Sequence, residues 1–193
     1  SLCLQARWWV TNPKGAISCG RGAQRKARST VTPLTASALR LPEEVALDRE
    51  PKAFLFLVNP TLAYDPYPDW ARWIPQLAAG ETIVTTWNTG TRRQGIKPGD
   101  CGVVVKVGTH PKGAIGFATV TSEIWIGPHW YPEAKPTETG FVDVQLDALL
   151  PVDEPIPLTE LKLIAPHIRW TPRMSGTEIP LEAALAVEDL MRE

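Results

Sequence analysis

The sequence has few of the residues that build metal sites and disulfide frameworks. Its 193 residues include three histidines and three cysteines, and the cysteines lie far apart at Cys3, Cys19 and Cys101. No Cys-x-x-Cys pair is present, so we expect neither a zinc site nor a disulfide scaffold. No apolar run approaches the ~20 residues that span a bilayer, and the N-terminus lacks the apolar stretch of a secretory signal. We therefore expect a cytoplasmic protein without a metal, a cofactor or a membrane partner.

Acidic residues are missing from the first part of the chain. Residues 1–42 contain seven basic residues and no acidic one, although the whole chain has a net charge of −1. Residues 43–193 therefore hold the other 13 basic and all 21 acidic residues, a net charge of −8. We predict a basic arm over residues 1–50 with little structure of its own, and one globular domain over residues 51–193. Three interpretations of the arm remain open: a nucleic-acid-binding tail, a transit-like or non-native segment, and an extension without a function.

Short apolar runs separated by turn residues predict a small α+β domain. The run 141–147 alternates strictly between apolar and polar residues, which indicates a strand with one solvated face. Helical spacing in 69–77 places Trp70 and Trp73 on one buried face. In total we expect five or six mostly antiparallel strands with short flanking helices, arranged as a small closed or half-closed barrel. The expected strands include 54–58, 101–108, 114–126 and 141–147, and the expected helices are 69–77, 158–164 and 180–192.

The stretch Trp87–Arg93 is the strongest candidate for a binding loop. It combines a tryptophan with small and amide side chains and with two neighbouring arginines, which suits a flat polar ligand that carries phosphate. The turn signal Pro98-Gly99-Asp100 and the β-branched run Val103–Val105 follow it. We therefore expect an exposed loop that is held by a core strand, as binding loops commonly are.

Six segments of the chain carry a pattern in a fixed order, namely 54–60, 87–100, 113–122, 128–130, 142–150 and 170–179. Together they cover roughly residues 52–192, which no short motif achieves by chance. In this order they resemble the EVE domain. More narrowly, the sequence is similar to the EVE-like module that precedes an HNH nuclease in modification-dependent restriction enzymes. The resemblance implies a pseudo-β-barrel related to PUA, YTH and ASCH domains, with a pocket that receives a flipped, modified base.

A pocket for a flipped base needs residues for three roles: stacking on the base, hydrogen bonding to its edge and binding the flanking phosphates. Aromatic stacking and hydrogen bonds to the base edge must offset the cost of extruding the base, and cations take the flanking phosphates. Each assignment has an alternative, because tryptophans of a small domain are more often core residues and a short charge run is usually solvated. Trp125 is expected to pack within the sheet. The candidates are Trp87, Trp130 and Trp170 for stacking, Asn88, Thr89, Gly90, Ser175 and Gly176 for the base edge, and Arg92, Arg93 and Lys97 for phosphates.

The related restriction enzymes carry the HNH nuclease after the reader, whereas this sequence ends at Glu193. Because His110, His129 and His167 supply no His-Asn-His-like motif, we expect a binding protein and not an enzyme. The expected partner is double-stranded DNA with a modified base, 5-methylcytosine or 5-hydroxymethylcytosine first, and a nuclease domain or subunit would act with the reader. The alternatives are a YTH-type reader of modified RNA and a small-ligand or protein interaction domain. The interaction domain would be favoured if side chains of the protein itself filled the space beside Trp87.

Overall fold

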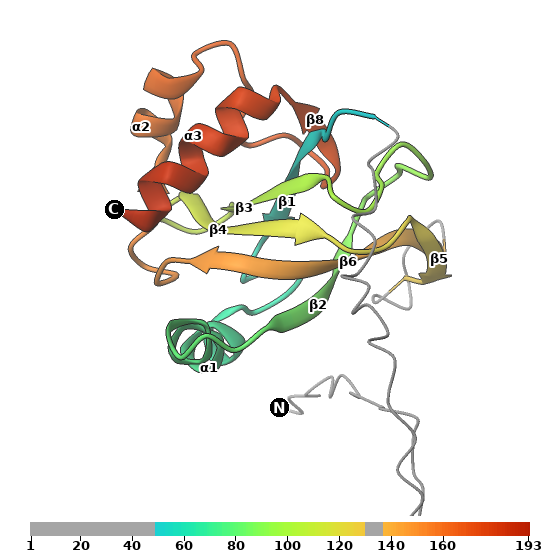
Figure 1. Ribbon diagram of the computed structural model, residues 1–193, viewed down its shortest axis with the longest axis horizontal. Coiled ribbons are helices and arrows are strands. Elements are labelled where there is room, and N and C mark those ends of the chain that lie inside the picture. Colours follow the sequence, from blue (N-terminus) through green and yellow to red (C-terminus); the bar gives the residue numbers. More distant parts are fainter. Residues whose placement is uncertain (1–48, 130–136) are drawn as a thin grey trace, which may run out of the picture. The chain divides into compact units, whose positions relative to one another are not determined.

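The computed structural model describes residues 49–129 and 137–193. The predicted arm lies outside these residues except for its last two positions, and so does Trp130. The described residues form eight strands and three helices (Figure 1). In chain order the elements are β1 (Ala53–Val58), α1 (Tyr67–Ala78), β2 (Ile83–Asn88), β3 (Cys101–Lys106), β4 (Gly113–Val120), β5 (Trp125–Pro128), β6 (Glu138–Leu149), β7 (Ile156–Pro157), α2 (Leu158–Ile164), β8 (Thr177–Ile179) and α3 (Leu181–Arg192).

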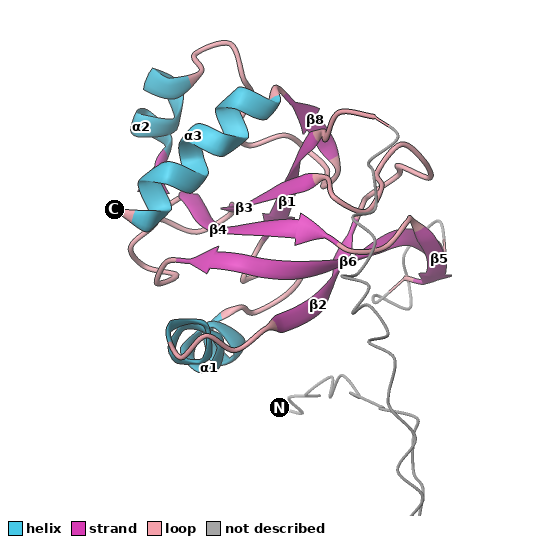
Figure 2. Ribbon diagram, in the orientation of Figure 1, coloured by secondary structure: helices cyan, strands magenta, loops and turns pink. Residues whose placement is uncertain are grey.

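All the strands belong to one sheet, whose main order is β2-β6-β4-β3-β1-β8 (Figure 2). Strand β5 pairs with β6, and β7 pairs with β4. The β1–β3 pairing is parallel and the other pairings are antiparallel. The predicted α+β class with mostly antiparallel strands is therefore confirmed. The strands number eight and not five or six. Strand β2 was not recognised, the predicted strand 114–126 is divided into β4 and β5, and β7 and β8 have only two and three residues and are too short to recognise in the sequence.

The sheet is open along its two edges. Among the described residues no ladder joins β2 to β1 or β8. A side chain bridges the ends of β2 and β1 instead, because Trp87 Nε1 donates a hydrogen bond of 3.3 Å to the Leu57 carbonyl oxygen. The sheet is therefore curled enough for these two strands to come together without pairing.

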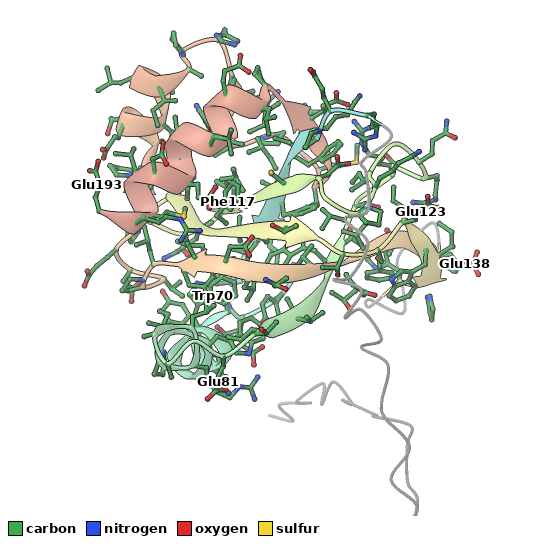
Figure 3. The ribbon with its side chains drawn as sticks, in the orientation of Figure 1. Trp70, Glu81, Phe117, Glu123, Glu138 and Glu193 are labelled. Carbon is green, nitrogen blue, oxygen red and sulfur yellow. The ribbon has the colours of Figure 1, made fainter. Side chains whose placement is uncertain are left out.

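Each face of the sheet carries its own apolar core. Helix α1 covers one face, where Trp70 and Trp73 are buried as predicted. Helices α2 and α3 cover the other face and bury Leu161, Ala184 and Val187. Figure 3 shows Trp70 between α1 and the sheet, and Phe117 on the side of α3. Helix α1 has 12 residues, extends beyond the predicted range 69–77 at both ends and continues through Pro75.

The turn before β3 is built around the buried carboxylate of Asp100. This side chain accepts hydrogen bonds from the backbone nitrogens of Lys97, at 2.8 Å, and Lys52, at 2.9 Å. It also forms a 2.6 Å ion pair with Arg49. Because Lys52 leads into β1, Asp100 fixes the approach to two neighbouring strands at once. The interactions account for Asp100 as a structural residue.

None of the helices in residues 49–129 and 137–193 is long and apolar enough to cross a membrane.

Candidate functional site

Two segments that are far apart in the sequence meet beside the end of β1. We call residues 89–93 the 89–93 loop and residues 174–178 the 174–178 segment. The Gly176 nitrogen donates to the Leu55 carbonyl oxygen at 2.8 Å, and the Leu57 nitrogen donates to Ser175 Oγ at 2.8 Å. The 174–178 segment is therefore fixed to β1, and the 89–93 loop packs against it.

Glycines occupy the points where the two backbones approach each other. A Cβ atom on Gly176 would lie 2.7 Å from the Thr89 carbonyl oxygen, and one on Gly90 would lie 2.9 Å from the Ser175 carbonyl oxygen. Both glycines also have a positive φ, +78° at Gly176 and +65° at Gly90, which favours a residue without Cβ. Glycine at positions 90 and 176 therefore allows the 89–93 loop and the 174–178 segment to approach each other closely.

Side chains of the 89–93 loop and its neighbours hold the loop in shape. Asn88 Oδ1 accepts from the Gly90 nitrogen at 2.6 Å, and Asn88 Nδ2 donates to Thr139 Oγ1 at 3.0 Å. Thr89 is fully buried, and its hydroxyl donates to the Arg92 carbonyl oxygen at 2.9 Å. The polar groups of Asn88 and Thr89, which we expected at a base edge, therefore make hydrogen bonds within the protein in this structure.

A shallow hollow of about 520 Å³ lies between the loop and the segment and is largely open to solvent. Its volume falls in the range of roughly 300–1,000 Å³ of small-ligand sites, although those sites enclose most of the ligand surface and this hollow does not. Three of the predicted residues line it, namely Arg92, Ser175 and Gly176. The remaining lining residues are Thr91, Met174, Thr177 and Glu178. The sequence analysis missed Glu178 because the three-residue strand β8 brings it beside Phe54 of β1.

Charged side chains surround the hollow. Arg92 Nε donates to the Gly176 carbonyl oxygen at 2.7 Å, and its guanidinium lies 5.1 Å from the centre of the Phe54 ring. Arg92 Nη1 is 3.7 Å from Glu178 Oε2, while Glu178 Oε1 accepts from Lys52 Nζ at 2.8 Å. These pairs are partly exposed, so each contributes little to stability. With two cations and one carboxylate, this side of the hollow is locally positive on an otherwise acidic domain.

The other two predicted phosphate ligands do not line the hollow. Arg93 Nη1 donates to the Gly90 carbonyl oxygen at 3.0 Å, and Arg93 Nη2 donates to the Glu138 carbonyl oxygen at 3.2 Å. Arg93 thereby ties the loop to β6 while its side chain stays exposed. Lys97 is exposed on the turn that precedes β3. Both side chains are exposed and accessible to a phosphate.

The tryptophans are placed differently from the sequence prediction. Trp87 is the penultimate residue of β2 and is only 6% exposed, and the ring centres of Phe56, Tyr64 and Trp70 lie between 6.2 and 6.5 Å from its own. The expected exposed tryptophan on a loop is therefore wrong, because β2 continues through Trp87 and turns its ring into the α1-side core. The protein's own aromatic side chains occupy the space beside this ring, and by the criterion set from the sequence this finding favours an interaction domain over a base pocket at Trp87.

Trp170 lies in the other core and is 2% exposed, with Nε1 donating to the Ala165 carbonyl oxygen at 3.3 Å. The sheet separates it from Trp87, so these two rings are not opposite walls of one pocket. Trp130 lies outside the described residues. Trp125, expected to pack, stacks on Phe141 with ring centres 4.8 Å apart but is 42% exposed, since β5 extends from the main sheet.

Groups that could perform chemistry are sparse in the described residues. No three His, Cys, Asp or Glu side chains in 49–129 and 137–193 form a group that could hold a metal ion. Asp100 is committed to its structural contacts. Burial, followed by the nearby Glu188, Asp100 and Asp147 carboxylates, raises the pKa of the Cys101 thiol to about 11. Because the thiolate is the nucleophile, Cys101 is poorly suited to nucleophilic catalysis.

The raised pKa of Cys101 predicts slow alkylation. At pH 8 a pKa of about 11 leaves about one thiol in a thousand ionised, compared with about one in four at the usual pKa of ~8.5. We expect iodoacetamide to modify Cys101 about two orders of magnitude more slowly in the folded protein than in urea, measured by mass spectrometry of its peptide. Equal rates in the two states would contradict this prediction.

Asp147 on β6 predicts a pH-dependent stability. Thr119 Oγ1 donates to its carboxylate at 2.7 Å, but burial, reinforced by Glu188, raises its pKa, and this outweighs the hydrogen bonds and the lowering effect of Arg192. A raised folded-state pKa means that the folded protein binds this proton more tightly. The resulting stabilisation is present at acidic pH and is lost as the pH rises through the folded-state pKa.

We therefore expect Asp147→Asn to be more stable than the unmodified protein at pH 7, with the difference shrinking toward pH 3. Urea unfolding followed by circular dichroism across this pH range measures the difference. A difference in the free energy of unfolding that does not depend on pH would show that the substitution acts through packing instead.

Comparisons with known proteins give similarities in structure only. No family model matches the sequence, and no curated protein does. A hypothetical protein from Leishmania major aligns with a TM-score of 0.50 and 14% identity, over 74% of this chain and 96% of that one. The human THYN1 protein, in complex with DNA containing 5-methylcytosine, aligns with a TM-score of 0.48 and 16% identity, over 74% and 98%. The Mmi1 YTH domain, in complex with RNA, aligns with a TM-score of 0.43 and 10% identity, over 73% and 79%.

At these low sequence identities, the feature that the chain shares with the solved structures is the fold. The chain has a mixed α+β fold, in which an antiparallel-dominated sheet carries helices on both faces, and it shares this fold with the Leishmania protein. The similarity covers about three quarters of this chain and nearly all of the Leishmania protein. Function has to be argued from the site itself.

Proposed function

We propose that this chain is a reader of a modified base in DNA, and that the hollow between the 89–93 loop and the 174–178 segment receives the flipped base. The hollow itself carries the proposal: about 520 Å³ is enough for one nucleobase, and glycines and an arginine line or back it. It lies between two of the six segments that resemble the EVE domain. The base-contact residues we retain from the sequence are Ser175 and Gly176, which line the hollow, and Gly90, which packs against them.

The chemistry of the hollow suits the flat face and polar edge of a base. Met174 is exposed at its rim and offers apolar contact, and an arginine guanidinium plane is a known stacking partner for bases. The hydroxyl of Ser175 uses an oxygen lone pair to accept from Leu57, which leaves its proton available to a base oxygen or nitrogen. Trp87 supports the site from the core and does not stack on the base.

The phosphates that flank the flipped nucleotide are assigned to Arg92, Arg93 and Lys97. The net charge of −8 over residues 43–193 makes non-specific attraction to DNA weak, so these local cations must orient the duplex. The basic residues before position 43 add a second source of attraction. We expect affinity that falls steeply with salt and selectivity that does not.

The biological role we propose is that of a specificity module for modification-dependent restriction in the cytoplasm, with 5-methylcytosine or 5-hydroxymethylcytosine as the base. This role rests on the resemblance to the reader that precedes an HNH nuclease, and a nuclease domain or subunit would supply cleavage. The chain itself would act by binding and not as an enzyme.

The test is a binding titration with matched duplexes containing cytosine, 5-methylcytosine, 5-hydroxymethylcytosine or N6-methyladenine, and with single-stranded RNA, at two salt concentrations. Selective binding to one modified duplex that persists at the higher salt supports the proposal. Preference for the RNA would favour a YTH-type reader. Equal, salt-sensitive binding to every ligand, or none, would reject base reading and favour a small-ligand or protein interaction domain.

The matched variants are Arg92→Ala and Arg72→Ala. Arg92 lines the hollow, whereas Arg72 is an exposed arginine on α1 that pairs with Asp69. Loss of affinity in the first variant alone would assign the binding to the hollow. Equal loss in both would indicate a general effect of charge.

A further inference from the structure

The hollow contains donors and acceptors that are already committed and a few that are not. Ser175 Oγ accepts from the Leu57 nitrogen, and the Gly176 carbonyl oxygen accepts from Arg92. The Thr177 hydroxyl donates to the Met174 carbonyl oxygen at 3.0 Å, and the Thr91 hydroxyl is directed at the Met174 sulfur at 3.8 Å. A ligand that needs a strong acceptor must therefore find it elsewhere in the lining.

Glu178 supplies that acceptor. One of its oxygens, Oε1, is held by Lys52 Nζ at 2.8 Å. The other, Oε2, has its nearest cation, Arg92 Nη1, at 3.7 Å, which is beyond a normal hydrogen bond. In the described part of the chain no hydrogen bond to Oε2 is present. Lys52 thus occupies one carboxylate oxygen, and the other oxygen stays available at the wall of the hollow.

Carboxylate and guanidinium side by side match one edge of cytosine. The N4 amino group of cytosine is a donor, for which a Glu or Asp carboxylate is the fitting partner. The neighbouring N3 and O2 atoms are acceptors, and an arginine or a serine hydroxyl donates to such atoms. Methyl or hydroxymethyl groups at position 5 leave this edge unchanged, so the edge contact and the recognition of the modification are separate.

We infer that Glu178 binds the N4 amino group of the flipped cytosine and is a specificity-determining residue of the site. The inference rests on the proposed function, because it requires a cytosine derivative in the hollow. Glu178 belongs to β8, which pairs with β1, so the acceptor is presented from the sheet and not from a mobile side chain on a loop.

The experiment compares two duplexes that differ by one amino group. One contains 5-methylcytosine, and the other contains 5-methyl-2-pyrimidinone, which lacks the amine, at the same position. Fluorescence anisotropy measures both affinities for the unmodified chain, for Glu178→Leu and for Lys52→Leu. Removal of the amine also weakens base pairing and makes flipping easier, but this effect is equal for all three proteins and cancels in the comparison.

We call the fold loss of affinity on removal of the amine the amine penalty. We expect this penalty to be about ten times larger for the unmodified chain than for Glu178→Leu, because one good base-edge contact is worth about 1–3 kcal/mol. Lys52→Leu, which breaks the same ion pair but keeps the acceptor, should retain the penalty. An equal penalty in Glu178→Leu would overturn the inference while leaving the proposed function intact. A penalty abolished in both variants would also overturn it, since the ion pair and not the contact would then matter.

Two further outcomes are decisive. If Glu178→Leu keeps its circular dichroism spectrum and binds neither duplex, the inference is rejected, because one contact accounts for about tenfold and not for the whole affinity. If the unmodified chain binds neither duplex, the proposed function fails first and the inference falls with it.

Discussion

Trp87→Ala is expected to lower the free energy of unfolding by about 3–5 kcal/mol, the usual cost of truncating a buried aromatic side chain. Trp87 is 6% exposed and its ring lies among Phe56, Tyr64 and Trp70. Removal of the indole would leave a cavity in the α1-side core. It would also remove the bridge from Nε1 to the Leu57 carbonyl oxygen that links β2 to β1. Urea unfolding followed by circular dichroism measures the loss without relying on tryptophan fluorescence.

Two controls separate burial from aromatic character. Trp125→Ala removes a tryptophan that is 42% exposed on β5, and we expect a loss of about 1 kcal/mol or less, as for a partly exposed site away from the core. Trp87→Phe keeps an aromatic ring in the core and loses the hydrogen bond, so it should lie between the two. The Trp87→Ala protein could instead prove as stable as the Trp125→Ala protein and no longer discriminate modified DNA. That result would support the sequence prediction that Trp87 stacks on the base.

The sequence predicted most of the sheet because its strands are short apolar runs between turn residues. Strands β1, β3 and β6 and the helices α2 and α3 lie where the pattern placed them. Strand β2 was missed, although Ile83-Val84-Thr85-Thr86 is a β-branched run of the kind that favours a strand. That omission made Trp87 look like a loop residue. Periodicity alone also does not tell which face of a sheet a buried ring occupies, and Trp170 was therefore named as a stacking residue beside Trp87 although the two rings lie in different cores.

The candidate site was predictable only where local conformation constrains the residue type. Gly90 and Gly176 have positive φ and touch a neighbouring backbone, and both stand in segments that carry the resemblance to a known family. Glu178 and Lys52 had no such signal. They meet across the hollow because β8 pairs with β1, a contact between residues more than 120 positions apart. The polar groups of Asn88 and Thr89 were assigned to the ligand because their hydrogen bonds within the loop depend on Thr139 and on the backbone fold, which the sequence does not display.

Gly176→Ala is expected to weaken binding to the preferred modified duplex at least about tenfold, and Gly80→Ala is its matched control. The two glycines have nearly the same φ, +78° and +80°, so an alanine at either position costs about 1–2 kcal/mol of backbone strain. They differ in their surroundings. A Cβ at Gly80 meets nothing within 4 Å, whereas a Cβ at Gly176 would lie 2.7 Å from the Thr89 carbonyl oxygen. The difference between the variants therefore reports the close approach alone.

The added Cβ at Gly176 must push the 89–93 loop and the 174–178 segment apart, because the segment is held to β1 through Leu55. We expect an additional loss of stability of about 1–3 kcal/mol relative to Gly80→Ala, as for other overpacked sites, and normal binding by Gly80→Ala. Titration with the modified duplex at a temperature where both variants are folded separates binding from stability. If the Gly176→Ala protein is destabilised as described but binds as tightly as the Gly80→Ala protein, the loop and the segment do not form the base site. The ligand surface would then have to be sought on another part of the sheet.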